Sequence, residues 1–300
     1  MTILIGHGGA SAIAPANTIA SFDAALRAGV DMIEFDVRPR GSRLLVAHLA
    51  PQARRRGCLT FDHALDHLAH PRFSQIALNV DVKGRGCESA LVAMLRAHGM
   101  LERSLISSQS AAVVETVRAI AGEARTAISI GGHLSRRANR WHPRDWRGRL
   151  LKELAAGRFG DVMLHHKLVD AEMAEAIRRL GRRLFAWTVD EPALFARIAD
   201  LGVAGVATND PARLRRRSDV DHANRSDGVD LRSTRAGKVE RVEPRDKARA
   251  SRRAFGRLYG VQRSERTGEM VGTAGLHHPE AGIRPACRGD LSDRDAATRG

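Results

Sequence analysis

Short runs of β-favouring aliphatic residues alternate with amphipathic helical stretches from residue 1 to about residue 212. The predicted strands are Ile3–His7, Met32–Val37, Ile76–Lys83, Ser104–Ser107, Thr126–Ile130, Val162–His165, Arg183–Val189 and Val203–Ala207. The predicted helices are Thr18–Ala28, Phe61–Ala69, Glu88–His98, Ala111–Ala121, Gly148–Ala156, Ala171–Leu180 and Pro192–Leu201. Eight strands separated by helices are typical of a TIM (β/α)8 barrel.

One strand-like run, Leu44–His48, breaks this alternation because only Arg38–Arg43 separates it from the preceding strand. A parallel crossover needs a dozen or more residues. We therefore expect a short β-hairpin after the second strand, which would bring His48 back over the barrel mouth.

The composition changes at residue 213. Residues 213–300 hold 21 Lys or Arg and 13 Asp or Glu, with few large aliphatic side chains and no sustained period. Such a segment cannot bury enough apolar surface to fold alone. We predict a barrel domain over residues 1–212 and a disordered basic C-terminal tail over residues 213–300. A nucleic-acid or acidic-lipid arm is the alternative for the tail.

The formal net charge of +15 invites a nucleic-acid interpretation. However, all but five of the 49 basic residues are Arg, and they are spread over the whole chain. We read this as a compositional bias and do not expect nucleic acid as a partner. The three cysteines have no paired spacing, and neither a membrane span nor a leader pattern is seen, so we expect a cytoplasmic protein.

Charged residues cluster near the ends of two predicted strands. Alternation along Ile33–Val37 sends Glu34 and Asp36 to the barrel interior, and alternation in the next strand puts Asp81 and Lys83 on one face. Three neighbouring carboxylates offer hard oxygen ligands suited to Mg²⁺ or Ca²⁺. A structural ion-pair network is the alternative. His7 and His48 would add an acid and a base, which makes a site for phosphoryl chemistry.

These residues also carry a family resemblance. The motifs are Gly6-His7-Gly8-Gly9, Ala14-Pro15-Ala16-Asn17-Thr18, Ile33-Glu34-Phe35-Asp36-Val37, Val46-Ala47-His48, Leu78-Asn79-Val80-Asp81-Val82-Lys83, Ala186-Trp187-Thr188-Val189 and Gly202–Pro211. In order and spacing they resemble the glycerophosphodiester phosphodiesterases, over residues 3–212.

The resemblance implies a phosphoric diester hydrolase that splits glycerophosphodiesters, small-molecule substrates, into an alcohol and glycerol 3-phosphate. By position, Glu34, Asp36 and Asp81 would hold a divalent metal, and His7 and His48 would be the catalytic acid and base. Substrate binding would fall to Lys83 and Trp187. A lysophospholipase D-like activity with the same constellation remains open.

Four positions depart from the family pattern. Gly8, Ala16 and Leu49 stand where the family has Arg, Glu and Asp, and Asp81 stands where it usually has Glu. The missing Arg removes a bidentate phosphate clamp. We therefore expect a weak or altered phosphodiesterase, with a catalytically impaired barrel that binds a phosphate ligand or a partner as the alternative.

Two further groups border the expected site. The segment His133–Arg149 mixes arginines with Trp141 and Trp146, which suits either a lipid headgroup or membrane surface, or simply a solvated loop. His165 and His166 end the sixth strand, and we expect polar filler there rather than ligands. The sequence does not indicate an oligomeric state.

Overall fold

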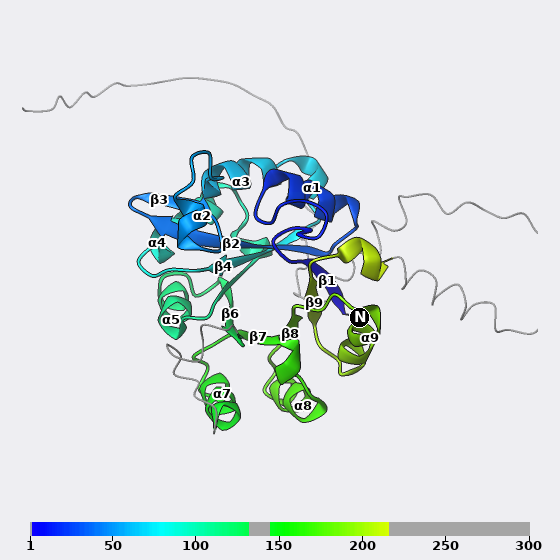
Figure 1. The fold of residues 1–300 in the computed structure, drawn as a ribbon. Coiled ribbons are helices and arrows are strands. Elements are labelled where there is room, and N and C mark those ends of the chain that lie inside the picture. Colours follow the sequence, from blue (N-terminus) through cyan, green and yellow to red (C-terminus); the bar gives the residue numbers. More distant parts are fainter. Residues whose placement is uncertain (1, 132–144, 216–300) are drawn as a thin grey trace, which may run out of the picture. The chain divides into compact units, whose positions relative to one another are not determined.

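Eight parallel strands close into a barrel in the computed structural model, which describes residues 2–131 and 145–215 (Figure 1). β1 pairs with both β9 and β2, which closes the ring. The parallel strands are β1 (Ile3–Gly6), β2 (Met32–Arg40), β4 (Ala77–Val82), β5 (Ser104–Ser108), β6 (Arg125–Ile130), β7 (Asp161–His165), β8 (Leu184–Trp187) and β9 (Gly205–Thr208). The predicted TIM barrel is confirmed.

Helices surround the barrel in the described part of the chain (Figure 1). They are α1 (Ile19–Arg27), α2 (Ala50–Ala53), α3 (Phe61–Leu68), α4 (Glu88–Ala97), α5 (Ala111–Ile120), α7 (Trp146–Ala155), α8 (Ala171–Arg179) and α9 (Pro192–Asp200). Single 3₁₀ turns occur at η1 (Pro71–Phe73), η2 (Leu101–Arg103) and η3 (His166–Leu168). None of these helices is long and apolar enough to cross a membrane.

The predicted hairpin is present. β3 (Arg43–Val46) pairs antiparallel with the outer end of β2, with Val37 opposite Val46. His48 follows two residues after β3, at the barrel mouth. The short segment between His48 and α3 still accommodates the one-turn helix α2.

Alternation along the strands separates two cores. Ile33, Phe35 and Val37 face outward into a core shared with the surrounding helices, where the Phe35 ring lies 5.2 Å from that of Phe22. A second cluster fills the barrel interior with Ile3, Ile5, Met32, Ala77, Leu105, Ala127, Met163, Phe185 and Ala207. This interior packing forms a floor beneath the polar residues at the carboxyl ends of the strands.

Some predicted bounds shift. β1 ends at Gly6, so His7 lies in the turn that follows it, and β8 is shorter than the predicted Arg183–Val189. Helix α1 is capped by the Thr18 side chain, which accepts a hydrogen bond from the Ser21 backbone N–H. Asn17 is not part of that cap. Its φ of 63° turns its side chain elsewhere, as described below.

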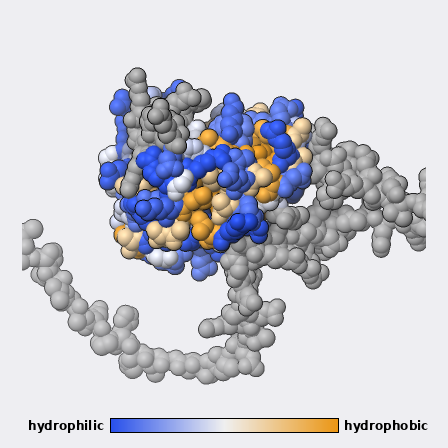
Figure 2. Space-filling model, turned by 90° about the horizontal axis from the view of Figure 1, so that it is seen from below, coloured by the Kyte–Doolittle hydropathy of each residue, from blue (hydrophilic) through white to orange (hydrophobic). Residues whose placement is uncertain are grey.

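Some of the surface arginines form ion pairs where the structure describes them. Arg158 pairs with Glu115 and Glu153, and Arg178 pairs with Glu175. Figure 2 shows apolar areas interrupted by strongly polar ones on the face seen from below. Leu214 is buried in the core, so packing extends just past residue 212; the remainder of the predicted tail lies outside the described residues.

Candidate active site

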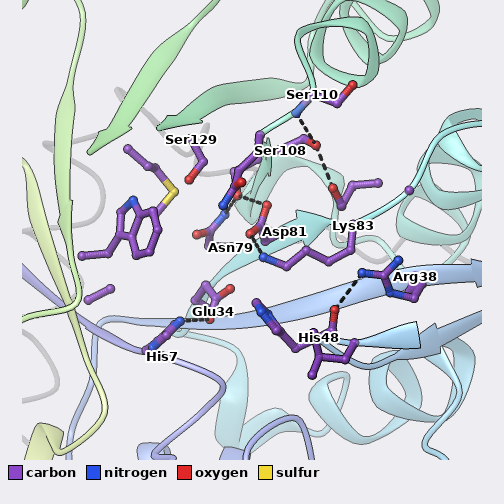
Figure 3. A pocket seen from close by; sticks show the side chains of 18 of the residues that line it. His7, Glu34, Arg38, His48, Asn79, Asp81, Lys83, Ser108, Ser110 and Ser129 are labelled. Carbon is purple, nitrogen blue, oxygen red and sulfur yellow. Dashed lines mark hydrogen bonds and ion pairs between the residues drawn. The ribbon is translucent and has the colours of Figure 1, made fainter. Parts of the chain in front are cut away.

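A cavity of about 600 Å³ opens at the carboxyl ends of the barrel strands (Figure 3). Six of the seven predicted site residues line it: His7, Glu34, His48, Asp81, Lys83 and Trp187. The seventh, Asp36, is buried beside them and belongs to the same carboxylate cluster. The structure therefore brings all the predicted site residues to one end of the barrel.

Glu34, Asp36 and Asp81 form a buried acidic cluster, in which one oxygen of each carboxylate lies within 4.8 Å of the others. The register between β2 and β4 explains this, because Asp36 stands directly opposite Asp81. Buried like charges at this distance repel one another. Burial and the neighbouring Asp36 raise the pKa of Glu34 from its ordinary 4.5 to about 7.

Lys83 lies between two of these carboxylates. Its Nζ is 2.9 Å from Asp36 Oδ1 and 2.5 Å from Asp81 Oδ2. Burial on its own would lower the pKa of Lys83, but the three carboxylates outweigh burial and raise it. For Asp36, burial opposes ionisation, yet the hydrogen bond from His48 and the charge of Lys83 hold its pKa well below the ordinary value. The predicted ion-pair network thus exists, but one lysine cannot balance three carboxylates.

The donor set of this cluster fits a hard divalent cation. Oxygens on opposite sides of a bound ion lie about 4.6–5.2 Å apart for Ca²⁺ and about 4.0–4.2 Å apart for Mg²⁺. The spacing of the three carboxylates is compatible with these values. A cation would also balance the negative charge that Lys83 leaves uncompensated.

The His7 side chain is held by Asn209, which lies near the C-terminal end of the barrel domain. Its Nδ1 is 2.8 Å from Asn209 Oδ1, and its Nε2 is 3.9 Å from Glu34 Oε2. Burial lowers the pKa of His7, but Glu34, the Asn209 hydrogen bond and Asp36 together outweigh burial and raise it above 6.5.

His48 approaches the cluster from the hairpin. Its Nδ1 lies 3.2 Å from Asp36 Oδ2, and about half of its side chain is exposed. Figure 3 shows His7 and His48 along the lower edge of the pocket, with Asp81 and Lys83 above them. The neighbouring Leu49, one of the departures, is exposed and contributes apolar surface to the lining.

Besides Asn209, three further supporting residues were not predicted. Asn17 donates from Nδ2 to Asp36 Oδ2 at 2.8 Å and accepts from the Asp36 backbone N–H. Asn79 lies on the inner face of β4, two residues before Asp81, and donates to Ser107 Oγ. Asp190 accepts from Asn209. Asn79 could have been found from strand alternation, whereas Asn17 and Asp190 depend on long-range contacts.

Trp187 and Met163 contribute large apolar side chains to the pocket lining. Trp187 stacks edge-to-face on His165 at 5.4 Å, and its indole Nε1 is buried without a hydrogen-bond partner among the described residues. His165 packs against His166 and neither lines the cavity. Most of the basic, Trp-containing segment predicted at this rim, His133–Arg149, lies outside the described residues, which resume at residue 145.

Fold and site together define a barrel enzyme with its chemistry at the carboxyl ends of the strands. The glycerophosphoryl diester phosphodiesterase family matches residues 7–47 and 69–213. The chain belongs to this family, and the predicted class of phosphoric diester hydrolase is confirmed. The unmatched interval, residues 48–68, begins at His48 and contains the departure at Leu49.

Individual relatives are distant but cover most of the barrel. A glycerophosphodiester phosphodiesterase of Caldanaerobacter subterraneus is 25% identical over 248 residues, 71% of this chain and 96% of that protein. One from Arabidopsis thaliana is 25% identical, over 70% of this chain and 71% of its own length.

Solved structures agree on the fold. An Oleispira antarctica phosphodiesterase in complex with the product sn-glycerol-3-phosphate has a TM-score of 0.59 at 20% identity, covering 74% of this chain and 97% of that one. A glycerophosphodiester phosphodiesterase of Agrobacterium tumefaciens has a TM-score of 0.56 at 20% identity, covering 72% and 100%.

Proposed function

We propose that the protein hydrolyses glycerophosphodiesters to an alcohol and glycerol 3-phosphate, with Mg²⁺ or Ca²⁺ held by Glu34, Asp36 and Asp81. The observation that carries this proposal is the buried acidic cluster flanked by His7 and His48 in one cavity. A bound divalent cation would supply Lewis-acid neutralisation of the phosphoryl oxygens.

The remaining chemistry falls to the side chains. His7 takes the proton of the attacking water at Nε2 while that oxygen bonds to phosphorus. His48 gives a proton to the alcohol oxygen as its bond to phosphorus breaks. Lys83 adds positive charge beside the phosphoryl oxygens, and Trp187 forms the apolar wall against which the substrate lies. We assign this activity to residues 1–212 in the cytoplasm.

The test is an assay of the full chain with glycerophosphocholine and either Mg²⁺ or Ca²⁺, with cation binding followed by calorimetry. His7→Ala and His48→Ala should each lower kcat by about 10²–10⁴-fold. His67→Ala is the matched control, since His67 pairs with Asp23 outside the pocket. Absence of both turnover and cation binding in the wild type would refute the activity, and full activity in both variants would refute the acid and base roles.

A second candidate function rests on the departures at Gly8 and Leu49, which leave the scissile phosphate with fewer charged partners. In it the barrel binds a phosphate ligand without turnover. Calorimetry with sn-glycerol 3-phosphate separates the two, because tight binding together with no hydrolysis of glycerophosphocholine or lysophosphatidylcholine supports this candidate. Hydrolysis of lysophosphatidylcholine alone would indicate the lysophospholipase D-like alternative.

A further inference from the structure

Strands β2 and β4 carry matching layers of side chains up one side of the cavity. Glu34 stands opposite Asn79, and Asp36 opposite Asp81. Two residues further along each strand direction, the same inward face presents Arg38 and Lys83. Lys83 reaches back to Asp36 and Asp81, so Arg38 is the cation of this face that lies above the carboxylates, nearer the mouth.

Arg38 has donors available to a ligand. One guanidinium nitrogen, Nη2, donates to the His48 carbonyl oxygen at 2.8 Å. Its Nε is buried and out of a ligand's reach, whereas no hydrogen bond or ion pair joins Nη1 to the residues that the structure describes, and the side chain lines the cavity. Figure 3 shows Arg38 at the right-hand end of the pocket, across from His7.

Arg85 adds a second arginine to this end. It lines the cavity and is exposed, and no hydrogen bond or ion pair joins it to the described part of the chain. The loop that carries Arg85 packs closely against β2. Gly84 lies so near Pro39 that a Cβ built on Gly84 would be 2.7 Å from Pro39 Cδ. Gln109 and Ser110 also line the cavity, with neutral hydrogen-bonding groups.

The site carries more positive charge than is needed to balance its carboxylates and the phosphodiester group of a substrate. Lys83 and a bound divalent cation together would balance the three carboxylates of the acidic cluster. The single negative charge of a phosphodiester is balanced by the proton that His48 carries as the proposed acid. The positive charges of Arg38 and Arg85 then remain without a negative partner at their end of the pocket.

We propose that the preferred substrate is a glycerophosphodiester whose leaving alcohol itself carries an anionic group, a carboxylate or a phosphate monoester, bound by Arg38 and Arg85. This inference rests on the proposed function and adds the substrate class. The anionic group lies one layer above the acidic cluster, while the scissile phosphate lies at the cluster beside the two histidines.

The test compares substrates that differ only in this group. Glycerophosphoserine differs from glycerophosphoethanolamine by a carboxylate, and glycerophosphoinositol 4-phosphate differs from glycerophosphoinositol by a phosphate. We expect kcat/KM to favour the anionic member of each pair by about tenfold, since two partly exposed arginines contribute roughly three- to fivefold each. If kcat/KM favours the anionic member in only one pair, that pair shows whether the arginines bind a carboxylate or a phosphate.

Arg85→Met should lower the kcat/KM ratio of the two members about three- to fivefold through KM, without changing turnover of the member that lacks the additional anionic group. Arg85 is the better position for this test, because replacing Arg38 would also remove the hydrogen bond that the His48 carbonyl oxygen accepts. Arg40→Met is the matched control, because Arg40 lies on the same strand, outside the cavity, and donates to the Ala53 carbonyl oxygen.

A kcat/KM ratio near one in both pairs overturns the inference while leaving the proposed function intact. The same holds if Arg85→Met lowers kcat/KM equally for both members of a pair. If none of the four compounds is hydrolysed, the proposed function fails. Calorimetric binding of the same pairs then decides the inference by itself: tighter binding of the anionic member supports it, and equal binding overturns it.

Discussion

His7 and Asn209 are separated by 202 positions in the chain, yet His7 Nδ1 and Asn209 Oδ1 lie 2.8 Å apart. The Asn209 amide is oriented by Asp190, whose Oδ2 accepts from Nδ2 at 2.8 Å and whose Oδ1 accepts from the Asn209 backbone N–H. Because the amide nitrogen faces Asp190, the carbonyl oxygen faces the imidazole. Neutral His7 therefore carries its proton on Nδ1 and keeps Nε2 free to accept a proton.

Asn209→Ala should lower kcat by about 10–100-fold with KM nearly unchanged, because the imidazole loses the acceptor that fixes its tautomer. In ¹⁵N-labelled wild type we expect the His7 resonance of an Nδ1-protonated ring, and in the variant a mixture of tautomers. An unchanged tautomer with a reduced kcat would mean that Asn209 acts in another way.

Cation binding should depend on pH through Glu34. Its pKa of about 7 in the metal-free site means that the carboxylate is protonated below that pH and must release a proton to bind a cation. Affinity for Ca²⁺ should therefore be nearly constant above pH 7 and fall by roughly tenfold per pH unit below it. Calorimetry in buffers of different ionisation enthalpy measures the released proton. Glu34→Gln should remove this dependence, and a pH-independent affinity in wild type would contradict the prediction.

Lys83→Met should destabilise the metal-free protein by about 3–5 kcal/mol, because it leaves Asp36 and Asp81 buried without their ammonium partner. Saturating Ca²⁺ should recover much of this loss, since the cation replaces the missing charge. Urea unfolding with and without Ca²⁺ measures both effects. Lys152→Met, on the exposed face of α7, serves as the control, and equal unfolding free energies for the two variants would refute the prediction.

Restoring the family arginine at position 8 should carry a structural cost. Gly8 has a φ of +59°, and a Cβ there would lie 2.9 Å from the Ala16 Cβ. We expect Gly8→Arg to reduce the free energy of unfolding by about 1–2 kcal/mol through the left-handed backbone alone, with an added contribution from crowding. Adding Ala16→Gly should remove only the crowding part. A Gly8→Arg variant as stable as wild type would show that this turn relaxes.

The inward face of the barrel strands followed from the sequence alone. Side-chain alternation is a local property of extended backbone, so Glu34, Asp36, Asp81 and Lys83 could be assigned to one surface before any strand was paired. The hairpin followed from chain length, because six residues cannot form a parallel crossover. Motif order placed His7 and His48 near that surface.

Only the tertiary structure decided which groups hold these side chains in place. Asn17 faces Asp36 because the turn at residue 17 adopts a positive φ. Asn209 reaches His7 because β9 pairs with β1 as the barrel closes. Such contacts join distant parts of the chain, and no local period encodes them.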